Sequence, residues 1–172
     1  MHHNNNTMIS MYPEKIIDNR KIDIFYSGQP LSSRQILVNV LNNLKSKFEI
    51  YSNITPSFRT GLNIDDYYHM LGDTKISVCP DGTSIDTFRY VESFGSGCLV
   101  ITTNKDRNLW YYEKSPAIFI NNWDELTEDL INSLLLDNEK LREEGLKYYQ
   151  EYLSEEAVAE FIYDKIKKKI KI

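Results

Sequence analysis

The sequence is poor in the residues that build disulfide frameworks and metal sites. Its 172 residues include two cysteines and three histidines, and His2 and His3 lie in the polar start. Two cysteines do not make a disulfide scaffold, which indicates a reducing compartment, the cytoplasm. So few histidines argue against a histidine-built metal site. We therefore expect no metal and no resident cofactor.

Long apolar runs and an excess of positive charge are also missing. No run approaches the roughly 20 apolar residues that a membrane span requires, so no span is expected. The first residues, 1–6, lack the basic-then-apolar pattern of a signal peptide. With 20 basic and 25 acidic residues the formal charge is −5, which argues against general electrostatic binding to nucleic acid.

What remains is the composition of a soluble globular protein, with 41% apolar and 26% charged residues. The length suits one ordinary domain. Residues 1–20 are polar and weakly patterned, so we interpret them as a flexible arm. Residues 21–172 then form the domain, and its last part consists of helices.

Short apolar runs alternate with helical periods along the domain. Strands are expected at 22–26, 49–52, 75–79, 98–102 and 117–120, and helices at 36–48, 64–71 and from about 86 to 94. In the last of these helices Phe88, Val91 and Phe94 are expected to face inward. Three further apolar stripes predict C-terminal helices over 126–135, 141–152 and 158–170.

Strands that alternate with helices predict an α/β fold, a Rossmann-like three-layer sandwich with a mostly parallel sheet. Ligands of such sheets bind at the carboxyl ends of the strands. Three loops occupy that position, at residues 28–31, 80–86 and 102–106, and Gly28 opens the first of them.

The segment 76–103, ISVCPDGTSIDTFRYVESFGSGCLVITT, holds the most specific chemistry. Gly82 allows the backbone to approach a ligand closely, and the amides that precede the helix can bind a diphosphate. Arg89 can reach a phosphate, and Glu92, three residues later on the same helix face, can accept hydrogen bonds from both ribose hydroxyls. The residues predicted to bind this ligand are Gly28, Gly82, Thr83, Ser84, Thr87, Arg89 and Glu92.

Each of these signals also has a plain structural interpretation. Glu92 can be a solvated helix residue paired with Arg89, and the loop after residue 79 can be a simple turn. Arg59 is a further candidate phosphate ligand. We expect Cys79 and Cys98 to be buried reduced thiols and His69 to lie near the surface. Tyr67 and Tyr68 are expected to pack in the core or to stack on a base.

At these residues the sequence resembles GT-B glycosyltransferases, and within them the exostosin-like group (glycosyltransferase family 47-like). Cys79-Pro80-Asp81-Gly82 looks like the group's Cys-Pro-x-Gly loop, Arg89 to Glu92 like its Arg-x-x-Glu helix, and Gly97-Cys98 like its Gly-Cys before an apolar strand. The resemblance covers about residues 20–150 in layout and is specific over 76–103. It implies a single half of a GT-B architecture, in which Glu92 holds the nucleotide ribose and Arg89 contacts phosphate.

The resemblance implies a glycosyltransferase, or its donor-binding domain, that transfers a sugar from a UDP- or GDP-linked donor to a hydroxyl acceptor. A partner chain or domain is then expected to supply the acceptor site, because 172 residues hold one half of such an enzyme. Ser84 stands where many retaining members have a first glutamate. The alternatives are a non-catalytic nucleotide-sugar-binding or interaction module, or an unrelated flavodoxin-like domain. The missing Gly-x-Gly-x-x-Gly loop after the first strand argues against a dinucleotide site.

Overall fold

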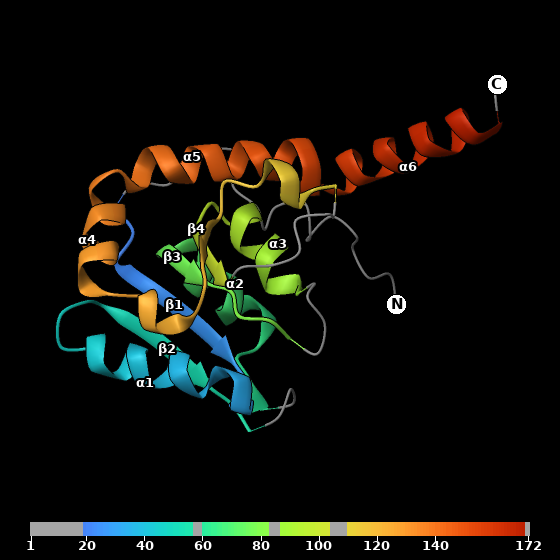
Figure 1. Ribbon diagram of the computed structural model, residues 1–172. Coiled ribbons are helices and arrows are strands. Elements are labelled where there is room, and N and C mark those ends of the chain that lie inside the picture. Colours follow the sequence, from blue (N-terminus) through green and yellow to red (C-terminus); the bar gives the residue numbers. More distant parts are fainter. Residues whose placement is uncertain (1–18, 57–59, 83–86, 104–109, 171–172) are drawn as a thin grey trace.

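A five-stranded parallel sheet forms the centre of the fold (Figure 1). The computed structural model describes residues 19–56, 60–82, 87–103 and 110–170. The strands are β1 (Ile22–Gly28), β2 (Ile50–Ile54), β3 (Thr74–Val78), β4 (Leu99–Thr103) and β5 (Ile118–Ile120). Their order is β2-β1-β3-β4-β5, and each neighbouring pair is parallel. The predicted Rossmann-like α/β fold is confirmed.

Helices connect the strands and complete the C-terminal part. Between strands lie η1 (Ser32–Arg34), α1 (Gln35–Leu44), α2 (Ile64–Gly72), α3 (Phe88–Gly95) and η3 (Tyr112–Lys114). After β5 follow η4 (Trp123–Glu125), α4 (Glu128–Leu136), α5 (Asn138–Tyr148), the π-helical turn η5 (Tyr149–Leu153) and α6 (Glu155–Ile170).

The two faces of the sheet carry separate parts of the core. Along β3, Ile76 and Val78 join the apolar cluster beneath α1 and α4. Ser77, between them, faces the other way and accepts a 2.7 Å hydrogen bond from Ser93 of α3. Because successive strand residues point to opposite faces, this alternation requires cover on both sides. Figure 1 shows that cover, with α1 and α5 on opposite sides of the sheet.

Helix α3, which carries Arg89 and Glu92, ends at a glycine turn. Gly97 stops it in the left-handed region, at φ 70°, and donates its N–H to the Phe94 carbonyl at 2.9 Å. Phe94 is buried and Val91 is half-buried, as their positions predict. Phe88 was expected to face inward, and this is wrong, because its side chain is 88% exposed. It is the first residue of the helix, where no further turn precedes it.

The two ends of the domain also differ from expectation. Arg20, assigned to the arm by its polarity, is buried and donates hydrogen bonds to the carbonyls of Thr74 and Ser96. Helix α6 forms as predicted, but the outer part of its apolar stripe is not packed, and Ile162 and Ile166 are each 51% exposed. Figure 1 shows α6 projecting beyond the body of the domain. Among the helices that the structure describes, none has both the length and the apolar character to cross a membrane.

Candidate functional site

A cavity of about 450 Å³ opens at the carboxyl ends of β1 and β3. These strands are neighbours, but the connection after β1 leads to β2 at one edge and the connection after β3 leads to β4 on the other side. The ends of two strands whose connections diverge leave a crevice, which is where open α/β sheets bind ligands. Two of the three predicted loops supply its wall, through residues 27–31 and through Gly82. Of the third loop, residues 104–106 lie outside the described residues.

Arg89 lies in the wall of this cavity, as predicted. Its Nη2 donates a hydrogen bond to the Ser27 carbonyl at the end of β1, and its guanidinium lies 5.6 Å from the centre of the Tyr26 ring. The Nε atom is buried and has no partner among the described residues. Since a guanidinium carries donors on all three nitrogens, Arg89 retains N–H groups for an anion.

A second arginine in the wall, Arg34, was not predicted from the sequence. Its side chain is buried, and Nε and Nη2 donate to the Asp81 carbonyl at 3.1 and 2.7 Å. Its Nη1 donates to the Gln29 carbonyl at 3.3 Å. Arg34 therefore joins the loop after β1 to the loop after β3 and adds positive charge to the cavity. Its position in the sequence could have indicated this role, because Arg34 directly follows a strand-end loop and precedes an apolar helix.

Gly28 makes room for both arginines. A Cβ atom at this position would lie 3.0 Å from Arg89 Nη2 and 3.3 Å from Arg34 Nη1. It would also lie 2.9 Å from the hydroxyl of Tyr26. These distances are shorter than ordinary carbon contacts of about 3.5–4.0 Å. The prediction of Gly28 as a site residue thus has a specific reason, which is the close approach of two guanidinium groups.

Glu92 lines the cavity with Arg89 but takes its hydrogen bonds from α2. The hydroxyl of Tyr67 donates to Glu92 Oε2 at 2.8 Å, and the hydroxyl of Tyr68 reaches Oε1 at 3.5 Å. Burial, and then the charge of Glu92, raise the pKa of Tyr67 well above its usual value, so its hydroxyl remains a donor. A carboxylate offers about four acceptor positions, and the two tyrosines leave some of them for a ligand. The alternative in which Glu92 pairs with Arg89 is not observed.

Two more predicted residues line the same cavity. Gly82 contributes backbone, and Thr87 places its side chain at the start of α3. The Thr87 hydroxyl oxygen is buried and has no hydrogen-bond partner in the described part of the chain. Thr83 and Ser84, and also Arg59, lie outside the described residues.

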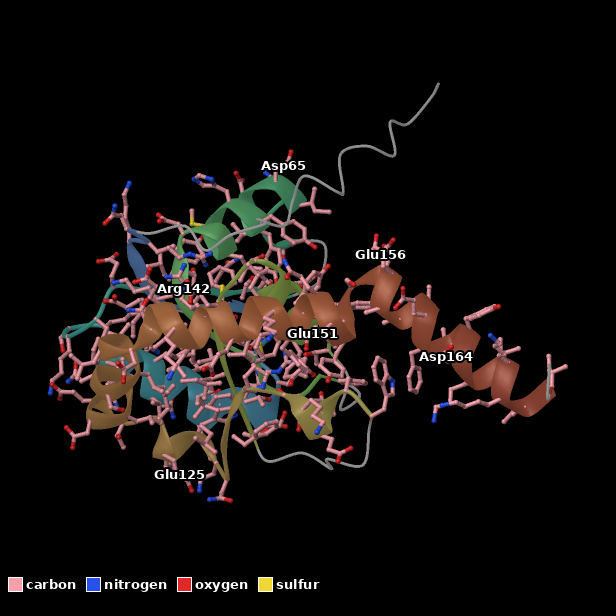
Figure 2. The ribbon with its side chains drawn as sticks, turned by 90° about the horizontal axis from the view of Figure 1, so that it is seen from above. Asp65, Glu125, Arg142, Glu151, Glu156 and Asp164 are labelled. Atoms are coloured by element: carbon pink, nitrogen blue, oxygen red, sulfur yellow. The ribbon has the colours of Figure 1, made fainter. Side chains whose placement is uncertain are left out.

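The remaining candidates are not part of this site. Cys79 and Cys98 are buried free thiols, as predicted, and burial raises the pKa of Cys98 to about 11. His69 is exposed on α2 and does not line the cavity. Asp65 is exposed near the start of the same helix, where Figure 2 labels it. Within the ranges that the structure describes, no group of three or more His, Cys, Asp or Glu side chains could hold a metal ion.

Comparison with known proteins identifies the fold. No protein-family model matches the sequence, and no curated protein matches it. Among the solved structures, the chain is similar to the C-terminal domain of a glycosyl transferase group 1 family protein from Francisella tularensis. The TM-score is 0.59 with 13% sequence identity, and the match covers 82% of this chain and 96% of that one. The chain therefore has the fold of one domain of such a glycosyltransferase, which supports the predicted GT-B half.

Proposed function

We propose that this chain is the donor-binding half of a glycosyltransferase and holds a UDP- or GDP-linked sugar in the cavity between β1 and β3. The observation that carries the proposal is the arrangement of Arg34, Arg89 and Glu92 around that cavity. Two guanidinium groups attract a diphosphate, although the chain as a whole has a charge of −5. A single carboxylate beside them suits a ribose diol.

The roles of the residues follow from their contacts. Arg89 keeps N–H groups free for the diphosphate, whose departure from the sugar requires nearby positive charge. Glu92, held by the Tyr67 hydroxyl, accepts hydrogen bonds from the ribose. Gly82 and Thr87 approach the phosphates from the start of α3. This assignment agrees with the exostosin-like motif over residues 76–103, which remains a resemblance in sequence.

Binding is tested by calorimetric titration of the purified chain with UDP, GDP, ADP and the corresponding sugar nucleotides. We expect uridine or guanosine diphosphates to bind with micromolar to millimolar dissociation constants. Amide chemical shifts should change at Gly82 and over residues 87–92. If no nucleotide produces heat or shift changes, the proposal is wrong.

A charge-removing variant of Glu92 makes the test specific to the site. Glu92→Gln keeps an oxygen that can accept from Tyr67, so folding should be retained. It loses charge-assisted hydrogen bonds to the ribose, each worth about 1.5–3 kcal/mol, so affinity should fall about ten- to a hundredfold. Glu151→Gln is the matched control, because it makes the same charge change at an exposed residue that does not line the cavity. Equal affinity in both variants would contradict the assigned role of Glu92.

A non-catalytic nucleotide-sugar-binding module is the second candidate. It is favoured by one observation, that Glu92 is the sole carboxylate among the described residues that line the cavity. We expect the isolated chain to transfer sugar slowly or not at all, and to hydrolyse the donor weakly at most. Rapid transfer by the monomeric chain would exclude this candidate and the need for a partner that supplies the acceptor site.

A further inference from the structure

A second cavity, of about 490 Å³, lies on the other side of the α3 N-terminus. Its walls come from the start of α3, from the segment before and within η3, from the π-helical turn η5 and from the start of α6. These elements are far apart in sequence, so only the folded chain forms this hollow. Its volume falls in the usual range for small-molecule sites, about 300–1,000 Å³. Single π-helical turns are themselves frequent at functional sites.

The described lining of this second cavity is rich in aromatic side chains. Trp110, Tyr111 and Tyr152 supply rings, Val91 and Val158 supply aliphatic surface, and none of the described residues that line it carries a charge. Trp110 is held in place by stacking on Phe161 of α6, with ring centroids 4.0 Å apart and planes 9° apart. Tyr111 meets Trp110 edge to face at 5.7 Å. Rings in a lining whose described residues are all uncharged favour a neutral ligand that presents an aromatic surface.

Two adjacent residues, Thr87 and Phe88, line both cavities. Phe88 leaves 88% of its surface in solvent and so forgoes the free energy of burying a phenyl ring. The Thr87 hydroxyl oxygen, by contrast, is buried and has no partner in the described part of the structure. Both features deviate from ordinary packing at the wall between the cavities. A ligand in the second cavity could cover Phe88 and lie beside a ligand in the first.

We propose that the second cavity binds the aromatic group of a neutral hydroxyl compound, which is the glycosyl acceptor. The binding stands on the cavity itself, and its description as the acceptor site rests on the proposed donor function. An acceptor in this position would extend its hydroxyl group past Thr87 and Phe88 toward the donor, because these two residues line both cavities. The chain would then contribute contacts to the acceptor as well as to the nucleotide.

Tryptophan fluorescence gives a direct measurement, because the two tryptophans have different surroundings. Trp110 lines the second cavity, whereas Trp123 is 5% exposed in the core beneath α1 and α4. The probe is phenyl β-D-glucoside, and methyl β-D-glucoside is the control that has the same sugar without the ring. We expect a saturable change in emission with the phenyl compound alone. The change should disappear in Trp110→Phe, which removes the reporter.

A pair of variants on α6 separates binding from general effects on the helix. Val158→Lys places a charge in the uncharged cavity and should weaken phenyl glucoside binding at least about tenfold, because a charge resists burial beside apolar groups. Ile166→Lys makes a similar change at a residue that is 51% exposed and does not line the cavity. Figure 2 shows α6 leading away from the body, with Glu156 near its base and Asp164 farther out. Since no described residue of α6 is buried, both variants should fold.

Different results would overturn the aromatic site and its role as an acceptor site. Absence of saturation, or equal responses to the phenyl and methyl compounds, would overturn the aromatic site. So would unchanged affinity in Val158→Lys, or equal loss in Ile166→Lys. Binding of phenyl glucoside by a chain that binds no nucleotide would refute the donor function, and with it the description of this site as an acceptor site. Nucleotide binding should persist in Val158→Lys, because Val158 does not line the first cavity.

Discussion

Replacing Gly28 with alanine tests whether the two arginines of the first cavity bind the nucleotide. The new Cβ would meet Arg89 Nη2 at 3.0 Å, Arg34 Nη1 at 3.3 Å and the Tyr26 hydroxyl at 2.9 Å. Tyr26 is fully buried, and Arg34 is held by the Asp81 carbonyl through two nitrogens. Arg89 has a hydrogen bond to the Ser27 carbonyl through Nη2, so its guanidinium is the group that moves most readily.

The expected effect is large on affinity and small on stability. Displacing Arg89 removes a charge-assisted hydrogen bond worth about 1.5–3 kcal/mol, which corresponds to about ten- to a hundredfold in the dissociation constant. An off-rotamer side chain costs about 0.5–1.5 kcal/mol. Alanine also lowers the conformational entropy of the unfolded chain, which offsets about 0.4–1 kcal/mol of the rotamer cost. This gain applies because Gly28 is not in the left-handed region. The free energy of unfolding should therefore change by less than about 1 kcal/mol.

Two other glycines provide matched controls. A Cβ at Gly72 meets nothing within 4 Å, so Gly72→Ala should keep both affinity and stability or gain slightly in stability. A Cβ at Gly145 would lie 3.0 Å from the Phe94 ring, so Gly145→Ala should lower stability by about 1–3 kcal/mol without changing the cavity. Urea unfolding measures stability, and calorimetric titration with UDP or GDP measures affinity.

If Gly28→Ala binds nucleotide as tightly as the parent chain, neither guanidinium contributes to binding. If Gly28→Ala loses as much stability as Gly145→Ala and no affinity per folded molecule, the close approach at Gly28 serves packing alone.

Two further predictions concern the interior. Arg20→Ala should lower the free energy of unfolding, measured in urea, by about 2–4 kcal/mol, because it leaves the carbonyls of Thr74 and Ser96 without their donor. Lys21→Ala is the control at an exposed residue, and it should change the free energy of unfolding by less than about 0.5 kcal/mol. Equal effects would contradict a structural role for Arg20. Burial raises the pKa of Cys98 to about 11, so the unfolded chain loses the thiol proton at a lower pH than the folded chain does. The contribution of Cys98 to the stability of the fold should therefore decline as the pH rises from about 9 to 11. The Tm of thermal unfolding should fall between pH 7 and 11, and it should fall less steeply with pH in Cys98→Ala. An equally steep fall in the variant would show that Cys98 is not its cause.

Much of the architecture was predictable because it depends on local periodicity. Strands were expected at residues 75–79 and 98–102, and both strands belong to the sheet. The cavity position followed as well, because the carboxyl ends of parallel strands meet at one edge. Gly28, Gly82, Thr87, Arg89 and Glu92 were accordingly predicted by their place in strand-end loops and on one helix face, and all of them line the first cavity.

The incorrect predictions arose where periodicity was taken as evidence of packing. Phe88 fits the apolar period of α3, yet it is the first residue of that helix and remains 88% exposed. The stripe of α6 is equally regular, yet Ile162 and Ile166 remain exposed. A period shows which residues share a face, and it does not show whether another element lies against that face.

The order and type of the elements follow from the amino-acid sequence, because propensity and side-chain period act over a few neighbouring residues. The overall charge and the loops from which a site could be built follow from it as well. The contacts within the site arise in the folded chain. Arg34 reaches the Asp81 carbonyl across 47 positions, and Tyr67 donates to Glu92 across 25. Such contacts depend on how distant segments meet, which no local pattern specifies.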